Sequence, residues 1–220
     1  MADINLEQAR HNMIEQQIRP WEVLDQRVLD TLNELPREAF MPSAYRDLAL
    51  IDTELPLGGG AYTMTPKLEA RLLQALAIEP YETVLEIGTG SGYLTALLAK
   101  LSRHVHSIEI DPTLLAAAAA RLTAHGISNV TLQQGDGSGG WPDAAPFDLI
   151  AVTGSVPFDD GTLRQQLRRD GRLFMIVGNA PVMEAQLTTR ISRDQFHTES
   201  LFETVVAPLQ GVAAPSRFIF

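Results

Sequence analysis

Cysteine is absent from the 220 residues, which excludes disulfides, thiolate nucleophiles and cysteine-type zinc sites. This composition suits a reducing compartment, and we expect the protein to be cytoplasmic. Long apolar runs are missing as well, since no uninterrupted stretch reaches the roughly 20 residues of a transmembrane helix. The first residues also lack the charged-then-apolar pattern of a signal peptide. We therefore expect no membrane partner.

Positive charge is scarce too. The chain has 17 Lys and Arg against 27 Asp and Glu, so its formal net charge is −10. Nucleic-acid backbones require a basic face, so we expect no nucleic-acid partner. The five histidines are scattered without metal-ligand spacing, and no metal site is predicted. With 45% hydrophobic and 20% charged residues, the composition is that of an ordinary globular protein.

The pattern along the chain predicts a single domain built from three stretches. Residues 1–54 form an N-terminal helical layer, with apolar spacing that predicts helices over 6–18 and 25–35. Residues 55–66 are a glycine-rich loop that we expect to lie over the ligand as a lid. Residues 67–220 form an α/β core.

Strands and helices alternate from residue 83 onward, which is typical of an open, mostly parallel sheet with helices on both faces. Five strands are predicted, over 83–87, 104–110, 129–133, 147–153 and 172–177. Helices are predicted from Pro66, over 94–101, from Pro112 with Asp111 as the cap, and over 162–169. Two further strands, over 185–191 and 201–208, are expected to form an antiparallel edge.

The core is organised around residues 84–93, which read V-L-E-I-G-T-G-S-G-Y. A short apolar strand ends in Gly88, Gly90 and Gly92 and a helix follows, which is how such a sheet presents a nucleotide-like ligand. The spacing is not the G-x-G-x-x-G of dinucleotide sites. Glu86 would repel a pyrophosphate, but it suits an ammonium or sulfonium group. These features predict S-adenosylmethionine as the ligand.

Three acids, Glu86, Glu109 and Asp136, stand at the ends of three successive predicted strands, which meet at one edge of the sheet. The offset 109 − 86 = 23 is close to the roughly 20 residues at which an acid meets ribose hydroxyls. Asp136 is placed to accept from the exocyclic amine of adenine. Any one of these acids could simply cap a helix or solvate a strand end. Three acids in register with the glycine turn favour a ligand site.

The sequence offers no candidate general base and no G-x-S-x-G motif. Methyl transfer to a carboxylate needs no base, because the nucleophile is already ionised at neutral pH. Catalysis of that reaction would depend on aligning the reacting atoms and excluding water.

The chain resembles the protein-L-isoaspartate O-methyltransferases over nearly its whole length. The motifs that carry the resemblance are V-L-E-I-G-T-G-S-G-Y, H-S-I-E, N-V-x-L-x-x-G-D-G, A-P-F-D-L-I, L-x-x-Q-L-R-x-x-G-R-L, Q-I-R-P, P-R-E-A-F-M-P and L-P-L-G-G-G. The P-R-E-A-F-M-P and L-P-L-G motifs point to this family among S-adenosylmethionine enzymes. The resemblance implies a Rossmann-like class I methyltransferase. Its substrate would be the α-carboxylate of isoaspartyl residues in damaged proteins, and its product S-adenosylhomocysteine.

The same resemblance assigns the parts of the cofactor to residues of this chain. The methionine part is assigned to Glu86, Gly88, Gly90 and Gly92, the ribose to Glu109, and the adenine to Asp136 and Gly137, with Thr89 and Ile110 as further cofactor-binding residues.

One position departs from the family pattern. The family loop usually reads G-Q-T-I-S-x-P, with the serine thought to be catalytic, whereas residues 60–66 read G-A-Y-T-M-T-P. Met64 therefore stands at the serine position, and a thioether donates no hydrogen bond. Thr63 and Thr65 offer hydroxyls on either side, so the candidate catalytic residues are Thr63, Met64 and Thr65. Neighbours in an extended segment point to opposite faces, and Thr65 is also the expected helix cap.

Three functions stay open from the sequence. The leading one is carboxyl methylation of isoaspartyl residues, with a peptide or protein bearing isoaspartate as the partner. The second keeps the cofactor but changes the acceptor, with Met64 and Tyr62 forming an apolar pocket. The third is a non-catalytic module that binds S-adenosylmethionine. The oligomeric state is open, with a monomer favoured.

Overall fold

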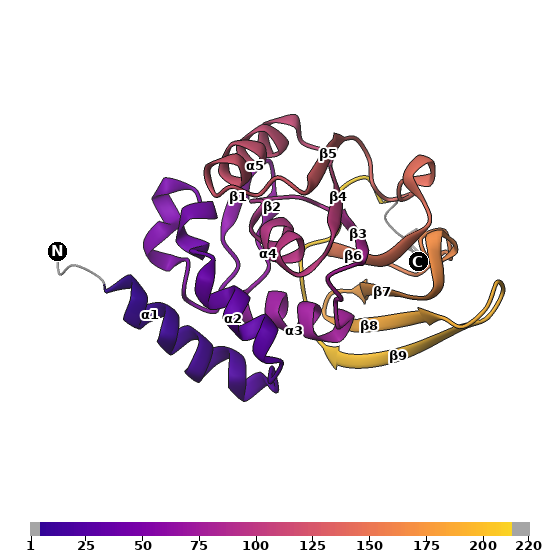
Figure 1. Cartoon of the computed structure of the whole chain (residues 1–220), viewed down its shortest axis with the longest axis horizontal. Helices are drawn as coiled ribbons and strands as arrows, with labels where there is room; N and C mark the ends of the chain where they lie inside the picture. The colour runs from indigo at the N-terminus through magenta and orange to yellow at the C-terminus, as the bar shows by residue number, and fades with distance from the viewer. Residues whose placement is uncertain (1–4, 213–220) are drawn as a thin grey trace, which may run out of the picture.

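The centre of the computed structural model, which describes residues 5–212, is a seven-stranded sheet with the order β5-β4-β3-β6-β7-β8-β9. Its strands are β3 (Thr83–Ile87), β4 (His104–Glu109), β5 (Val130–Gln134), β6 (Phe147–Val156), β7 (Leu167–Asn179), β8 (Val182–Arg190) and β9 (Phe196–Glu203). The first five pair in parallel, and β8 and β9 add an antiparallel edge (Figure 1). The predicted mostly parallel α/β sheet with an antiparallel edge is confirmed. The described α-helices, however, cover one face of the sheet and not both as expected.

Within residues 5–212, five α-helices accompany the sheet. They are α1 (Leu6–Asn12), α2 (Gln26–Glu34), α3 (Pro66–Leu76), α4 (Tyr93–Leu101) and α5 (Pro112–Ala124). The predicted helix over 6–18 continues from α1 as a π-helix, η1 (Met13–Ile18), and a 3-10 turn, η2 (Arg19–Trp21), follows. The cap predicted at Asp111 is confirmed, since its carboxylate accepts from the Thr113 amide, and Asp25 caps α2 in the same way by accepting from the Arg27 amide. Within the described residues no helix is long and apolar enough to cross a membrane.

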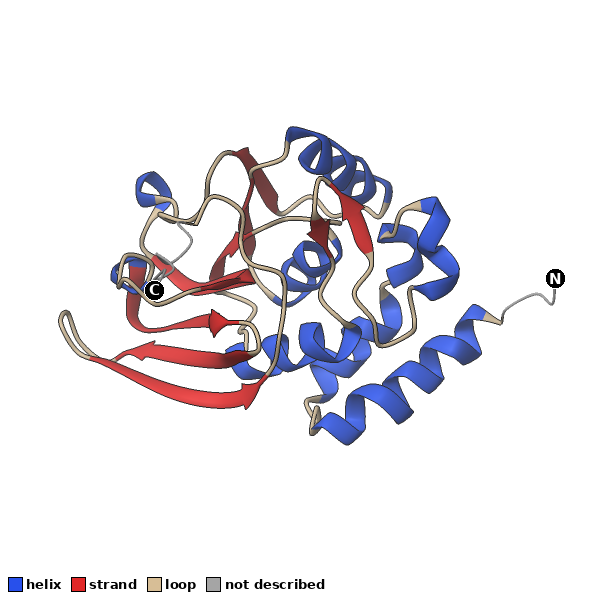
Figure 2. Cartoon of the chain, turned by 180° about the vertical axis from the view of Figure 1, so that it is seen from behind, coloured by secondary structure: helices blue, strands red, loops and turns tan. Residues whose placement is uncertain are grey.

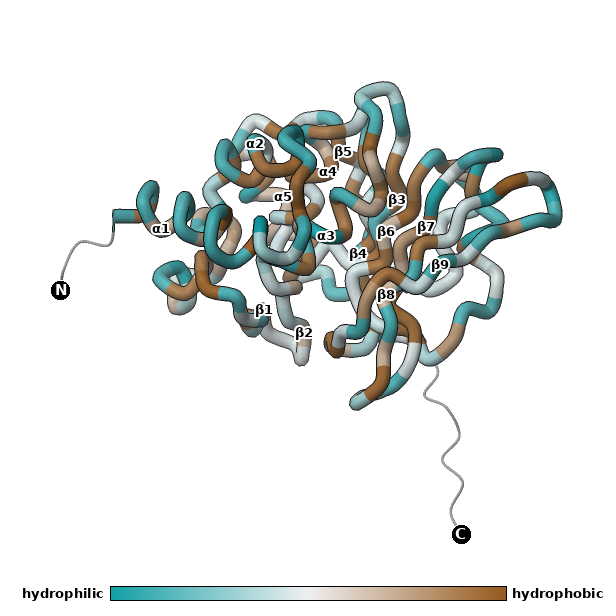
Figure 3. The backbone as a smooth tube through the Cα atoms, turned by 90° about the horizontal axis from the view of Figure 1, so that it is seen from below, coloured by the Kyte–Doolittle hydropathy of each residue, from teal (hydrophilic) through white to brown (hydrophobic). Residues whose placement is uncertain are grey.

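Alternate strand side chains pack on opposite faces of the sheet and form two cores. On one face Val84, Leu149 and Phe174 pack with the buried sides of α2, α3 and α4. On the other face Leu85 and Ile150 belong to a smaller core, to which no described α-helix contributes. Figure 2 shows the longer helices gathered on one side and only short helical turns on the other, and in Figure 3 the central strands are largely brown while α1 is mostly teal.

Short helical turns cover the second face of the sheet. The prediction of a helix over 162–169 is wrong. Only a 3-10 turn, η6 (Arg164–Gln166), forms there, as does η5 (Pro142–Ala144) further back in the chain. Strand β7 instead begins at Leu167, which is fully buried and paired with Phe147 of β6. Sheet pairing and burial at Leu167 override the local helical pattern.

The N-terminal layer is completed by two 3-10 turns, η3 (Arg37–Phe40) and η4 (Ser43–Leu48). The predicted loop over 55–66 contains a small hairpin of β1 (Pro56–Gly58) and β2 (Ala61–Tyr62). The predicted strand over 201–208 is wrong in its second half, because β9 ends at Glu203. Residues 206–210 leave β9 and run across the end of β6, where Ser155 exchanges backbone hydrogen bonds with Ala207 and Leu209.

Candidate active site

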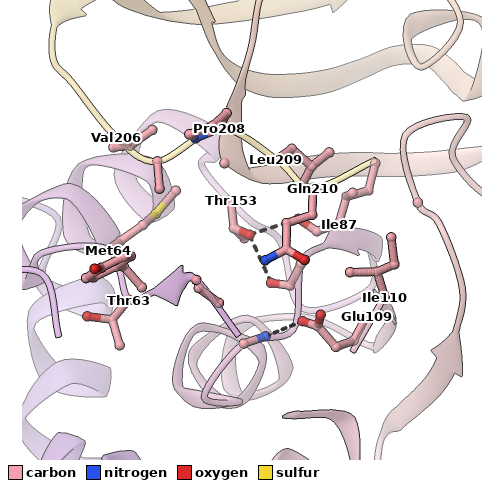
Figure 4. A pocket seen from close by; sticks show the side chains of 18 of the residues that line it. Thr63, Met64, Ile87, Glu109, Ile110, Thr153, Val206, Pro208, Leu209 and Gln210 are labelled. Atoms are coloured by element: carbon pink, nitrogen blue, oxygen red, sulfur yellow. Dashed lines mark hydrogen bonds between the residues drawn. The ribbon is translucent and has the colours of Figure 1, made fainter. Parts of the chain in front are cut away.

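A cleft opens where the parallel strands β3, β4, β5 and β6 end (Figure 4). Together with the open solvent at its mouth, the cleft encloses about 750 Å³ of empty space. One side, here called the strand-end wall, comprises Gly88, Gly90, Glu109, Ile110 and Gly137. The opposite side, the loop wall, comprises Thr63, Met64, Val206, Pro208 and Leu209.

The glycine turn of the strand-end wall is held by a residue that the sequence motifs do not single out. Gly88 has a positive φ of 96°, and a Cβ built on it would lie 2.2 Å from the hydroxyl oxygen of Thr153. That hydroxyl lies 2.9 Å from the carbonyl oxygens of both Ile87 and Gly88. Thr153 therefore ties the end of β6 to the turn. Its position at the end of the fourth predicted strand was the available signal.

Glu109 faces the cleft in an ordered position. Its Oε2 accepts from the Gly90 amide at 2.8 Å, and its Oε1 accepts from the Asp111 amide at 3.0 Å. A carboxylate has about four acceptor sites, so both oxygens retain capacity for a ligand hydroxyl. Ile110 follows it directly and lines the same wall.

Glu86 lies beneath the turn instead of in the cleft. It is fully buried, and its Oε2 accepts from the hydroxyls of Thr95 at 2.5 Å and Ser107 at 2.6 Å. Burial raises the pKa of Glu86 to about 8, so its carboxyl group is mostly neutral at pH 7. Within the described residues this acid supports the sheet and α4, and it does not line the cleft.

The remaining predicted cofactor residues are placed unevenly. Thr89 lines a small adjoining pocket, which shares Thr63, Met64 and Gly90 with the cleft, and its hydroxyl lies 2.6 Å from that of Ser107. Gly92 is the N-cap of α4 and lies outside the lining. Asp136 is exposed and accepts from the Ser138 amide at 2.9 Å, so its neighbour Gly137 lines the cleft instead.

The loop wall presents a thioether to the cleft. In Figure 4 the side chain of Met64 extends toward Val206 and Pro208, while the hydroxyl of Thr63 points the other way. That hydroxyl accepts from the Leu55 amide at 3.0 Å and from the Arg37 guanidinium at 3.4 Å. Thr65 occupies the N-cap position of α3, but its side chain makes no cap hydrogen bond and does not line the cleft.

Residues 206–210 form the other part of the loop wall, and sequence reasoning missed them. They carry no motif and approach the strand ends only through the fold. A Cβ on Gly154 would lie 2.8 Å from the Leu209 amide nitrogen, so this close crossing requires glycine at residue 154. The Gln210 side-chain amide donates to the Gly59 carbonyl at 3.1 Å. This hydrogen bond joins the C-terminal crossing to the β1–β2 hairpin.

The charge of the cleft is one-sided. None of its described lining residues is basic, whereas Glu54 and Glu109 are acidic. Burial raises the pKa of Glu54 above its ordinary value. Among the described residues no group of three or more His, Asp or Glu side chains could hold a metal ion. The lining therefore suits an organic cation, with nearby apolar groups on the loop wall.

Comparison with known proteins gives consistent results. The family model described as protein-L-isoaspartate(D-aspartate) O-methyltransferase matches residues 8–213. A protein-L-isoaspartate O-methyltransferase 1 of Rhodopseudomonas palustris is 42% identical over 203 residues, which cover 92% of this chain and 83% of the relative. A protein-L-isoaspartate O-methyltransferase of Roseiflexus castenholzii is 42% identical over 191 residues, covering 86% of each chain.

Two solved structures share the fold. A protein-L-isoaspartate O-methyltransferase superposes with a TM-score of 0.80 at 25% identity, covering 93% of this chain, which spans 66% of that longer one. A structure of a putative protein-L-isoaspartate O-methyltransferase from Plasmodium falciparum in complex with S-adenosyl-L-homocysteine gives 0.78 at 19% identity, covering 94% and 98% of the two chains.

Proposed function

The chain belongs to the protein-L-isoaspartate(D-aspartate) O-methyltransferase family, and we propose that it methylates the α-carboxylate of isoaspartyl residues in peptides or proteins. Its cofactor is S-adenosylmethionine, as in the rest of the family. The observation that carries the proposal is the continuous cleft, which joins the strand-end wall to the loop that contains Met64. One wall is suited to the cofactor, and the other is placed to receive the acceptor.

The strand-end wall fits the cofactor. Glu109 faces the cleft with both oxygens held by backbone amides, which suits two ribose hydroxyls. Gly88 and Gly137 leave no room for a side chain, because a Cβ would lie within 2.2 Å of the Thr153 hydroxyl and 2.8 Å of Ile87 respectively. We propose these groups, with Thr89, Gly90 and Ile110, as the cofactor site. Glu86, Gly92 and Asp136 would act from outside the lining by holding the turns.

When bound, the cofactor supplies an electrophilic methyl group on a positively charged sulfonium. The chain supplies position and a dry environment. An acceptor carboxylate needs no base, and the acidic, base-free lining leaves the sulfonium as the positive charge available to it at this place. Met64, Val206 and Leu209 exclude water from the loop wall. Of the three candidate catalytic residues, Met64 contacts the cleft most directly, Thr63 braces the loop behind it, and Thr65 stays outside.

The test uses purified protein, methyl-labelled S-adenosylmethionine and two peptides that differ only in isoaspartate versus aspartate. The proposal expects base-labile label on the isoaspartyl peptide and background label on the aspartyl peptide. No label on either peptide, with S-adenosylhomocysteine binding intact by calorimetry, would overturn the acceptor assignment and leave the cofactor site standing. Equal label on both peptides would overturn specificity for isoaspartate.

We further propose that the enzyme acts in the cytoplasm as a monomer and without a nucleic-acid partner. The composition supports this, since cysteine is absent and the net charge is −10. Sedimentation of the purified protein would test the oligomeric state, cell fractionation the location, and a mobility-shift assay with DNA and RNA the absence of a nucleic-acid partner.

A further inference from the structure

Behind the loop wall lies a buried ion pair that the proposed function does not yet use. Arg37 belongs to η3 and Glu69 to α3, and both side chains are almost completely buried. The Arg37 Nε donates to Glu69 Oε2 at 3.0 Å, and its Nη2 lies 3.4 Å from Oε1. Burial raises the pKa of Glu69, and the guanidinium opposes that rise. Glu69 also lines the small pocket that adjoins the cleft.

Arg37 also donates hydrogen bonds to two backbone carbonyls that lie far apart in the sequence. Its Nη1 donates to the Ala49 carbonyl at 2.6 Å, and its Nη2 donates to the Met64 carbonyl at 2.7 Å. The same Nη2 reaches the Thr63 hydroxyl at 3.4 Å. Ala49 and Met64 are the two ends of the segment 49–64, which carries the β1–β2 hairpin and the first part of the loop wall. One guanidinium therefore fixes both ends of this segment.

From these contacts we propose that Arg37, held by Glu69, is a positioning residue that sets the loop wall against the strand ends for methyl transfer. The proposal rests on the proposed function. Arg37 does not line the cleft, so it acts through Met64 and Thr63. A lysine has one donor point on a flexible stem and cannot reproduce the planar fork that reaches Glu69 and two carbonyls together.

The chain offers a control at a second Arg–Glu pair, which is partly buried. Arg172 donates to both carboxylate oxygens of Glu82, at 2.7 and 3.0 Å, and to the Leu76 and Ala77 carbonyls. Neither Arg172 nor Glu82 lines the cleft. Arg172→Lys therefore tests loss of a guanidinium network that supports the fold alone.

The kinetic experiment compares Arg37→Lys with Arg172→Lys, below the unfolding temperature of each variant. We expect Arg37→Lys to lower kcat/KM for an isoaspartyl peptide about 10- to 100-fold, because displacement of a wall by about 1 Å is costly. The affinity for S-adenosylhomocysteine, measured by calorimetry, should change less than about threefold, since the strand-end wall is intact. Arg172→Lys should leave both quantities near the wild-type values. Equal kinetic effects of the two variants would overturn the proposal.

A double variant distinguishes the effect of Arg37 on the position of the loop wall from its effect on the stability of the protein. Arg37→Met with Glu69→Leu removes the charges together, and apolar replacement of a buried pair often restores stability. We expect this variant to regain thermal stability relative to Arg37→Met alone and to keep the kinetic defect. Recovery of kcat/KM along with stability would contradict a positioning role.

A third readout does not depend on the acceptor. Amide hydrogen exchange over residues 49–64 of the ligand-free protein should rise in Arg37→Lys and in the double variant, but not in Arg172→Lys. If the wild-type protein transfers no methyl label to an isoaspartyl peptide, the proposed function fails, while this exchange pattern still supports Arg37 as the residue that holds segment 49–64 in place. Unchanged hydrogen exchange over residues 49–64 in Arg37→Lys would overturn the positioning role of Arg37, whatever the acceptor is.

Discussion

The two walls of the cleft differ in how the chain builds them. The strand-end wall comes from three consecutive strand ends between residues 87 and 137, and its key contacts are hydrogen bonds to backbone amides, such as Gly90 to Glu109. The loop wall joins residues 63 and 64 to residues 206–210, and its surface is largely apolar. The first wall depends on a local pattern and the second on chain crossings. Changes of acceptor are therefore easier to accommodate on the loop wall than changes of cofactor on the strand ends.

The largest effect is expected for the pH dependence of stability, which distinguishes the buried Glu86 from the residues that line the strand-end wall. The folded protein keeps the Glu86 proton up to about pH 8, whereas the unfolded chain releases it near the ordinary value of 4.5. Stability from this group is therefore complete below pH 4.5 and is lost as the pH rises toward 8. We expect Glu86→Gln to remove that part of the decline, at most a few kcal/mol, in urea unfolding at pH 5 and pH 8.

The same variant distinguishes support from ligand contact. S-adenosylhomocysteine affinity at pH 7 should stay within about threefold of wild type, because glutamine keeps the neutral shape beside Ser107 and Thr95. A large loss of affinity with an unchanged pH slope would mean that Glu86 is ionised and contacts the ligand.

Glu109 should show the opposite behaviour. Glu109→Ala removes the acceptor for the Gly90 and Asp111 amides and for the proposed ribose hydroxyls. We expect a loss of about 100-fold in S-adenosylhomocysteine affinity by calorimetry, since hydrogen bonds to charged groups contribute about 1.5–3 kcal/mol. Glu54→Ala removes the other acid of the lining but no hydrogen-bond acceptor of the strand-end wall, so it should lower the affinity much less than Glu109→Ala. Similar losses in both variants would erase the distinction between the walls.

Met64 tests the loop wall from its divergent position. Met64→Ser restores a donor at the place of the family serine, and we expect kcat/KM for an isoaspartyl peptide to rise about tenfold, the value of one good hydrogen bond. Met64→Leu keeps the volume without a donor and should stay near wild type. A serine variant no better than the leucine variant would show that the acceptor carboxylate is held elsewhere.

The smallest effect is expected at the hydrogen bond that joins the crossing at residues 206–210 to the β1–β2 hairpin. Gln210→Ala removes the bond to the Gly59 carbonyl, which is solvent-exposed. We expect the KM for the peptide to rise about twofold and the unfolding free energy to change by less than about 0.5 kcal/mol. A loss of more than about twofold in S-adenosylhomocysteine affinity would place Gln210 in the strand-end wall.

The predictability of the site follows the same division. The turn at 84–93 and the acid Glu109 were readable because strand, glycines and acid lie close in sequence and parallel strands bring their ends together. Burial of Glu86 was not readable, because a motif gives the place of a residue on a strand but not which face is covered. Residues 206–210 carry no functional motif, and only the crossing allowed by Gly154 brings them to the cleft.

The fold shows a similar limit. Strand β3 was predicted to the residue and its neighbour β4 within one residue, since the glycine turn marks the end of β3 and Asp111 and Pro112, which begin the next helix, mark the end of β4. The helix expected over 162–169 failed because Leu167 is drawn into pairing with Phe147, an interaction 20 residues away that local spacing cannot register. Arg37 belonged to a recognised motif, but its partners at Ala49, Met64 and Glu69 became visible only in three dimensions.

The most direct test of the account is a crystal structure with S-adenosylhomocysteine and an isoaspartyl peptide bound together. The account predicts the ribose hydroxyls on Glu109, the adenine beside Gly137, and the isoaspartyl carboxylate between Met64 and the crossing at 206–210. A nucleoside bound away from Glu109, or a peptide bound outside the loop wall, would contradict it.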